Sequence, residues 1–222
     1  EKARSLYEDL SQDLNYNVMF SPRGVMMLAQ TQHEIRGYQR TAHANSLQGV
    51  KTEFISPARV KELCPIMNID GPRYPVLGAL WQARGGSARH DAVAWGYARA
   101  CSDMGMHILQ KTEVTGITQQ AGMVTGVDTS RGHIGCKKLG MVVAGHASAV
   151  AEMAGFQLPI ESVPLPALVS APPKPCMHAG VLANKVPGSI AQHAQGEMVI
   201  GAGTVRAIYV ASAARSSAHV AH

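Results

Sequence analysis

The stretch from Arg84 to Ala98, RGGSARHDAVAWGYA, contains the residues most suited to chemistry. Two adjacent glycines, Gly85 and Gly86, let the backbone approach another group closely, because glycine has no Cβ. His90 follows where a helix is predicted to begin, with Asp91 in its first turn. A helix N-terminus carries about half a positive charge, which disfavours imidazolium and keeps a histidine neutral and nucleophilic. Two interpretations stay open: a histidine that bonds to a ligand, or a histidine cap beside a glycine turn.

Two further segments combine an apolar run with glycine. LGMVVAG, residues 139–145, predicts a fully buried strand, and the small residues after it predict a helix over 146–154. Such a junction brings backbone N–H groups to a ligand at the carboxyl end of a sheet, although tight strand-to-helix packing explains it equally well. EMVIGAGT, residues 197–204, is interpreted as a strand-end turn, because Arg206 stands where a dinucleotide fingerprint needs its third glycine.

Several classes of site lack their motif in this sequence. There is no GxSxG elbow and no GxxxxGK[ST] phosphate loop. The ten histidines form no HxxxH, HxH or HExxH pattern and the four cysteines no CxxC pair, so we predict no metal site and free thiols in a reducing cytoplasm. The net charge of +5 comes without a basic cluster, which argues against nucleic-acid binding. No apolar run approaches the ~20 residues that span a bilayer.

The elements around these segments indicate a mixed α/β fold. Apolar periodicity and capping residues predict helices at residues 1–14, 31–47, 57–63 and 91–104. Apolar runs predict strands at 18–20, 24–29, 53–55, 76–82, 107–109 and 139–145. TEVTGIT, MVTGVDT and HIGC are short runs separated by glycine-containing turns, which is typical of a β-meander. After Gly155, seven prolines between 159 and 187 favour short strands and loops.

Four longer segments carry a resemblance to a known family. QDLNYNVMFSPRGVMMLA, ARGGSARHDAVAWGYARA, EVTGITQQAGMVTGVDTSRGHI and VVAGHASAVAEMAGFQLPIES together closely resemble the beta-subunit family of bacterial heterotetrameric sarcosine oxidases. These are flavin-dependent amine oxidases of the wider D-amino-acid-oxidase type. The resemblance covers residues 1–170 densely, is loose between 174 and 195, and is scarcely visible after Gly203. RHDAVAWGYA is specific to this subunit, whereas the meander and VVAG are shared across the superfamily.

The resemblance implies two cofactors and their attachment sites. The family's beta subunit holds FAD noncovalently and FMN covalently on a histidine, and that histidine corresponds to His90. A valine whose backbone contacts the FAD adenine corresponds to Val114, and the strand that ends at Ala144 and Gly145 approaches the FAD from the other side. A neutral histidine at a helix start is suited to attack the 8α-methyl carbon of a flavin. No catalytic residue is assigned.

The resemblance also implies a reaction. Sarcosine is oxidised at the FAD, electrons pass to the FMN, and O2 becomes hydrogen peroxide there. The imine product goes on to glycine, and its one-carbon unit passes to tetrahydrofolate with the help of the alpha, gamma and delta subunits. The alternatives are a related FAD-dependent amine oxidase or dehydrogenase, of glycine, dimethylglycine or proline type, and a degenerate subunit without catalytic activity.

We therefore expect a cytoplasmic chain that is an internal fragment of a two-domain beta subunit. The family's GxGxxG turn and downstream acidic residue, which bind the FAD pyrophosphate and ribose, have no counterpart here. Residues 1–75 and 157–222 are predicted to belong to the substrate domain and residues 76–156 to the middle of the FAD domain, with a divergent tail after Gly203. Because half of the cofactor site is missing, the isolated chain is expected to be inactive and to bind FAD poorly.

Overall fold

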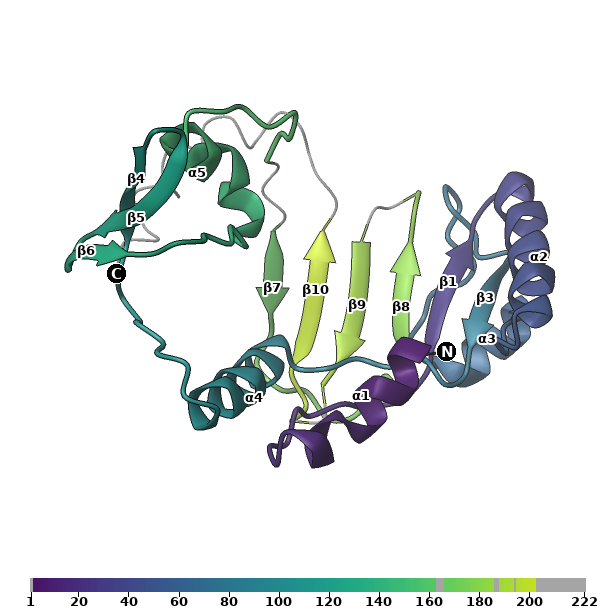
Figure 1. The fold of residues 1–222 in the computed structure, drawn as a ribbon. Coiled ribbons are helices and arrows are strands. Elements are labelled where there is room, and N and C mark those ends of the chain that lie inside the picture. Colours follow the sequence, from purple (N-terminus) through teal and green to yellow (C-terminus); the bar gives the residue numbers. More distant parts are fainter. Residues whose placement is uncertain (1, 163–165, 186–187, 194, 203–222) are drawn as a thin grey trace. The chain divides into compact units, whose positions relative to one another are not determined.

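The computed structural model describes residues 2–162, 166–185, 188–193 and 195–202, and these form two compact units. Unit 1 comprises the described residues within Glu1–Gly105 and Leu165–Ala214. Unit 2 comprises those within Met106–Pro164. Helices and strands are mixed throughout, which confirms the predicted α/β class (Figure 1). The predicted divergent tail after Gly203 lies outside the described residues.

Unit 1 is built on a seven-stranded mixed sheet with the strand order β2-β3-β1-β8-β9-β10-β7 (Figure 1). β1 pairs antiparallel with β3, where Met26 lies opposite Trp81, and parallel with β8, where Met26 lies opposite Val181. The sheet thus joins the N-terminal part of the chain to the segment after residue 166. Its strands are β1 (Val25–Ala29), β2 (Glu53–Ile55), β3 (Gly78–Gln82), β7 (Ala167–Val169), β8 (Gly180–Ala183), β9 (Gly188–Gln192) and β10 (Met198–Ala202).

Four helices accompany this sheet, and two of them begin at caps that the sequence predicts or encodes locally. Ser56 Oγ accepts a hydrogen bond from the Arg59 N–H at the start of α3, as a serine N-cap does. Thr31 Oγ1 accepts one from the Glu34 N–H at the start of α2. These caps satisfy N–H groups that lack partners within the helix. The helices are α1 (Lys2–Asp13), α2 (Gln32–Leu47), α3 (Pro57–Leu63) and α4 (His90–Asp103).

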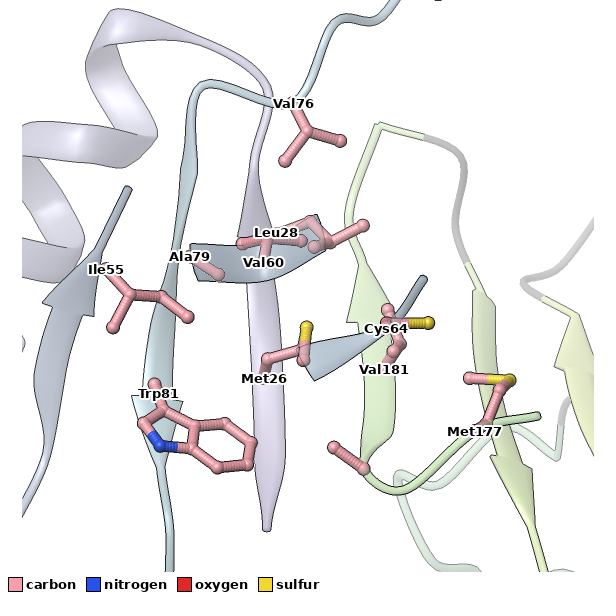
Figure 2. Packing of buried hydrophobic residues seen from close by; sticks show 11 residues of the cluster. Met26, Leu28, Ile55, Val60, Cys64, Val76, Ala79, Trp81, Met177 and Val181 are labelled. Carbon is pink, nitrogen blue, oxygen red and sulfur yellow. The ribbon is translucent and has the colours of Figure 1, made fainter. Parts of the chain in front are cut away.

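The core of unit 1 lies where one face of the sheet meets α3 and the segment before β8 (Figure 2). Met26 and Leu28 point to this face because side chains two apart on a strand share a side. Val60 of α3 and Cys64, which follows the helix, are completely or almost completely buried against them. Burying each side chain of this size is worth about 1.5–3 kcal/mol. This core holds rigid the sheet from which the loops around His90 extend.

Unit 2 contains the predicted meander. β4 (Val114–Gln120), β5 (Met123–Thr129) and β6 (Gly132–Gly135) form a three-stranded antiparallel sheet in that order, which confirms the prediction. The residues between β4 and β5, Ala121 and Gly122, both have positive φ angles, 52° and 76°, as a two-residue hairpin turn of type I′ requires. A 3₁₀ turn (Ala144–His146) and helix α5 (Ala147–Met153) follow.

Three predicted strands are wrong. Residues 18–20 and 107–109 are not in strands, and the 18–20 segment contributes only a bridge from Ser21 to Ser87. Residues 139–145 form neither a strand nor a buried segment, and Val142 is 94% exposed. An apolar run becomes a strand only when a neighbouring strand accepts its backbone hydrogen bonds, and no described strand lies beside this one.

The boundary between the two units differs from the predicted one at residue 75. β3 and α4 fall within the predicted range 76–156, yet both belong to unit 1, whose N-terminal segment ends at Gly105. β3 hydrogen-bonds to β1 and β2 on its two sides, so separating it would leave both ladders without partners. The packing of α4 is equally close, since a Cβ at Gly96 would lie 3.1 Å from Leu14 Cδ1. Which unit corresponds to a substrate or FAD domain stays a prediction.

Candidate functional site

His90 lies at the rim of a pocket in unit 1. The pocket has a volume of about 380 Å³ and is lined by three segments of the chain: α1, residue 20, and the stretch from Gly86 through the first turn of α4. Two aromatic rings stand together in it, with the centroids of Tyr7 and Phe20 5.9 Å apart and their planes tilted by 33°. The lining residues are Tyr7, Phe20, Gly86, Ala88, His90 and Val93. Apart from the Tyr7 hydroxyl and the His90 ring, the lining side chains are apolar.

The glycine pair brings the loop before α4 against the segment before β1. Ser21 and Ser87 exchange backbone hydrogen bonds of 2.8 and 3.1 Å. A Cβ at Gly86 would lie 2.5 Å from the Ser21 carbonyl oxygen and 2.9 Å from Pro22 Cα, closer than real Cβ contacts. A Cβ at Gly85 would lie 3.0 Å from Val25 Cγ2. The predicted close backbone approach is therefore made to the protein itself, and it fixes one wall of the pocket.

The start of α4 is held by the neighbours of His90 rather than by His90. Arg89 occupies the N-cap position with extended backbone and without a side-chain cap bond, so the interpretation of His90 as the cap is wrong. Arg89 Nε donates to Asp91 Oδ1 at 2.9 Å, and Arg89 Nη1 donates to Gln195 Oε1 at 2.5 Å. Asp91 Oδ1 also accepts from the Ala92 N–H at 2.9 Å.

The charge at this helix start lies on Asp91. Partial desolvation raises the pKa of the Asp91 carboxyl, but the hydrogen bonds from Arg89 and from the Ala92 N–H outweigh it and hold that pKa below its ordinary value. The carboxylate stays ionised and complements the helix N-terminus. The His90 ring, by contrast, is exposed and makes no hydrogen bond or ion pair with any residue that the structure describes. It is therefore available to react.

Sequence reasoning missed three residues around His90. Tyr7 lies in α1 and Phe20 in the segment wrongly predicted as a strand, and neither spacing nor residue type linked them to His90. Gln195 follows His90 by more than a hundred residues and reaches Arg89 only because β9 and β10 bring its turn there. The bridge between Ser21 and Ser87 is likewise a non-local contact. Only the fold reveals these partners.

The other predicted site residues lie in unit 2. Val114 is the first residue of β4 and is 37% exposed. Ala144 has a φ of 44°, an uncommon conformation for a residue with a side chain, and Gly145 follows it in the 3₁₀ turn. Gly145 has no positive φ, and a Cβ there would meet no atom of the described chain within 4 Å. Neither its conformation nor packing against the described residues therefore requires glycine at 145.

The described residues form neither a metal-binding cluster nor a membrane-spanning helix. No group of three or more His, Cys, Asp or Glu side chains in this part of the chain is placed to hold a metal ion. Across the same ranges, no helix combines the length and apolarity needed to cross a membrane. All four cysteines are free, as predicted, and burial raises the pKa of the Cys64 thiol above its ordinary value.

Comparison with known proteins gives consistent results. The family model for FAD-dependent oxidoreductases matches residues 1–220. Over 204 residues the chain is 67% identical to a sarcosine oxidase subunit beta of Rhodobacter capsulatus, covering 92% of this chain and 49% of that protein. It is 47% identical over 204 residues to a sarcosine oxidase subunit beta of an Arthrobacter species, covering 91% of this chain and 50% of that protein. The chain thus spans about half the length of the curated relatives that it matches.

The fold is also found among solved structures. An L-proline dehydrogenase from P. horikoshii matches with a TM-score of 0.78 over 91% of this chain and 54% of that one, at 23% sequence identity. At this identity the likeness concerns the fold alone, and it agrees with the mixed α/β architecture of both units.

Proposed function

Because this chain belongs to the family of FAD-dependent oxidoreductases, we propose that it is part of the beta subunit of a sarcosine oxidase and carries covalent FMN on His90. The identity of 67% to a protein named sarcosine oxidase subunit beta, over 92% of the chain, is the observation that carries this proposal. The exposed His90 ring beside an aromatic pocket adds an independent reason from the structure.

The proposed reaction is the oxidation of sarcosine to glycine. When bound, the two flavins supply the redox chemistry: an electron pair leaves sarcosine at FAD and reaches O2 at FMN, which yields hydrogen peroxide. The one-carbon unit is passed to tetrahydrofolate with the help of the alpha, gamma and delta subunits. We place the enzyme in the cytoplasm, a location with which four free cysteines are compatible.

The pocket beside His90 suits the dimethylbenzene edge of a flavin. Its volume of about 380 Å³ lies within the range of roughly 300–1,000 Å³ typical of ligand sites. Tyr7 and Phe20 present aromatic surface, and no charged side chain of the described residues lines it. Flat aromatic ligands stack favourably on such rings. His90 stands at the rim, where its nitrogen can meet the 8α carbon at that apolar edge.

Covalent attachment of FMN to His90 is an oxidation and therefore needs an electron acceptor. An imidazole nitrogen of His90 would bond to the 8α-methyl carbon of FMN, with loss of one C–H hydrogen of that methyl group and of the imidazole proton, and O2 would carry off the released electron pair as hydrogen peroxide. His90 must therefore offer a free lone pair. Its ring has no competing partner among the described residues, which supports this role.

We propose that unit 2 contributes to the noncovalent FAD site through Val114, Ala144 and Gly145. The contact at Val114 is made by the backbone, so it needs no particular side chain. Gly145 leaves open space on its own backbone, which allows a ligand to approach closely. The backbone strain at Ala144 fits a functional position, since such strain clusters at ligand sites.

The decisive experiment maps covalent flavin in the full-length beta subunit, expressed with its partner subunits. After acid precipitation, flavin fluorescence should stay with the protein and, after proteolysis, with the peptide that contains His90. His90→Asn should abolish it, whereas His43→Asn, at an exposed helical histidine, should not. Protein-bound flavin that is missing from the His90 peptide would refute the assignment and favour a related amine oxidase or dehydrogenase. A subunit that assembles with its partners but lacks activity would indicate the degenerate alternative.

A further inference from the structure

Arg89 connects the helix that carries His90 to a distant part of unit 1. Its Nη1 donates to Gln195 Oε1 at 2.5 Å, while its Nε donates to Asp91 at 2.9 Å. Gln195 lies in the turn between β9 and β10. The residues on both sides of His90 are thus tied together, and through Arg89 they are tied to the seven-stranded sheet. We call the contact between Arg89 and Gln195 the Arg89–Gln195 bridge.

The turn that carries Gln195 is itself held firmly. Gln192, at the end of β9, is only 5% exposed, and its Nε2 donates to the Gly196 carbonyl at 2.9 Å. Its Oε1 accepts from the N–H groups of Cys176 and Met177 at 2.8 and 3.0 Å. A buried amide with bonds on both its oxygen and its nitrogen has one allowed orientation. Gln195 therefore stands on a fixed support, although its own side chain is exposed.

No polar contact with a described residue fixes the direction of the His90 ring. The ring makes no hydrogen bond or ion pair with the described residues, and the N-cap residue of α4 makes no side-chain cap bond. The ring direction consequently depends on how the first turn of α4 is oriented. Bond formation requires reacting atoms at near-attack distance, and a misplacement of ~1 Å can slow a step about 100-fold.

We propose that Arg89 is a positioning residue for flavin attachment: the Arg89–Gln195 bridge orients the first turn of α4 so that His90 faces the pocket lined by Tyr7 and Phe20. This inference rests on the proposed function of His90. Arg89 acts through the helix start and not by touching the flavin, since its Nε and Nη1 are engaged by Asp91 and Gln195. Loss of Gln195 must therefore have the same effect as loss of Arg89.

The test measures the rate of covalent attachment in the full-length beta subunit, coexpressed with its partner subunits in a riboflavin-starved host. FMN and FAD are added to the flavin-free complex, and the mass of the His90 peptide is followed over time. We expect Arg89→Gln and Gln195→Ala each to slow attachment about 10- to 100-fold. The double variant should be no slower than the slower single variant, because the bridge is lost once. Gln195→Glu, which keeps an acceptor for Arg89, should attach FMN at the wild-type rate.

Arg59→Gln is the matched control. Arg59 is also a partly exposed arginine paired with a carboxylate near the start of a helix, with Nη1 2.6 Å from Glu62 Oε2, but it lies in α3 and away from the pocket. Its attachment rate should equal that of wild type. Noncovalent FAD content and circular dichroism, equal across all variants, separate an effect on positioning from misfolding. Gln195→Ala keeps the test valid if Arg89→Gln folds poorly.

The outcomes distinguish a failure of the inference about Arg89 from a failure of the proposed function of His90. Wild-type attachment rates in Gln195→Ala, or additive losses in the double variant, overturn the inference and leave the proposed function standing. A wild-type complex that never gains mass on the His90 peptide overturns the proposed function and the inference together. Slow attachment in Arg89→Gln and in Gln195→Ala, together with a wild-type rate in Gln195→Glu, supports the inference.

Discussion

Gln192 offers the sharpest test of how unit 1 is held together near the candidate site. Among the residues that the structure describes, it is the one buried polar side chain, at 5% exposure, and it links three segments. Oε1 accepts from the N–H groups of Cys176 and Met177, and Nε2 donates to the Gly196 carbonyl. Gln192→Ala removes these three bonds together with the two longer ones from Nε2 to the Pro173 and Lys174 carbonyls at 3.3 Å, and it leaves two N–H groups and three carbonyls to find other partners.

The size of the effect follows from what those groups lose. A buried N–H or carbonyl without a partner costs about 1–3 kcal/mol, and because Gly196 is only half-buried, water can satisfy part of the demand at its carbonyl. We therefore expect the free energy of local opening to fall by about 2–4 kcal/mol. Since each 1.4 kcal/mol is a factor of ten, amide hydrogen exchange at Cys176 and Met177 should accelerate about 30- to 700-fold.

Hydrogen exchange with mass spectrometry on the full-length subunit can measure this change in the peptide that spans Cys176 and Met177. Gln119→Ala is the matched control, because that exposed amide makes one hydrogen bond, to the Ala154 carbonyl. The control should leave exchange in this peptide unchanged. Acceleration of less than about threefold in Gln192→Ala would refute the account, because it corresponds to well under 1 kcal/mol.

Three further outcomes are expected. Gly86→Ala should lower the free energy of unfolding by about 1–3 kcal/mol, since the added Cβ would lie 2.5 Å from a backbone oxygen. Gly37→Ala, in open space within α2, should instead raise the free energy of unfolding by about 0.5–1 kcal/mol. Denaturant titration of the two variants and the wild type measures both changes. Cys64 should resist alkylation by iodoacetamide in the native protein and react at the rate of a free thiol in denaturant, because burial removes access and raises its pKa; fast native modification would contradict this. Gly145→Val should reduce noncovalent FAD in the purified full-length subunit, while Gly140→Val, equally free of contacts within the described chain, should retain it; equal FAD contents would speak against the site.

Local features of the fold were predictable because neighbouring residues encode them. Ser56 before Pro57 predicts a capped helix, and the structure has both the cap bond and the helix. The glycine-punctuated runs after residue 112 predict a meander, and β4, β5 and β6 form one. In each case the hydrogen bonds close within a few residues, so the spacing of residue types is sufficient to infer them.

Pairings between distant segments could not be predicted. β1 lies parallel to β8 with Val25 opposite Gly180, and no periodicity in either segment identifies the other as its partner. The same reason explains the error at 139–145. Hydrophobicity indicates that a segment tends to be buried, but the partner that buries it is a property of the whole fold. Val142, 94% exposed, has no such partner in the described chain.

The candidate site likewise combines residues that the sequence points to with residues that only the tertiary structure brings near. His90 stood out because a histidine at a predicted helix start is visible in the sequence, whereas its pocket depends on Tyr7 and Phe20, which only the tertiary structure brings near. The glycine pair was predicted to approach some other group, and that group is the backbone of Ser21 and Pro22. Their role is to place a wall of the pocket.

The position of His90 at the very start of α4 has a physical consequence for the proposed chemistry. Side chains on a helix lean toward its N-terminus, so the side chain of a first residue extends past the helix end and over the loop that precedes it. For α4 that loop carries Gly86 and Ala88, which line the pocket. A histidine one turn later would have its ring ~5.4 Å further along the helix. The helix start thus directs an exposed imidazole toward an apolar pocket, and the Arg89–Gln195 bridge fixes the angle at which it does so.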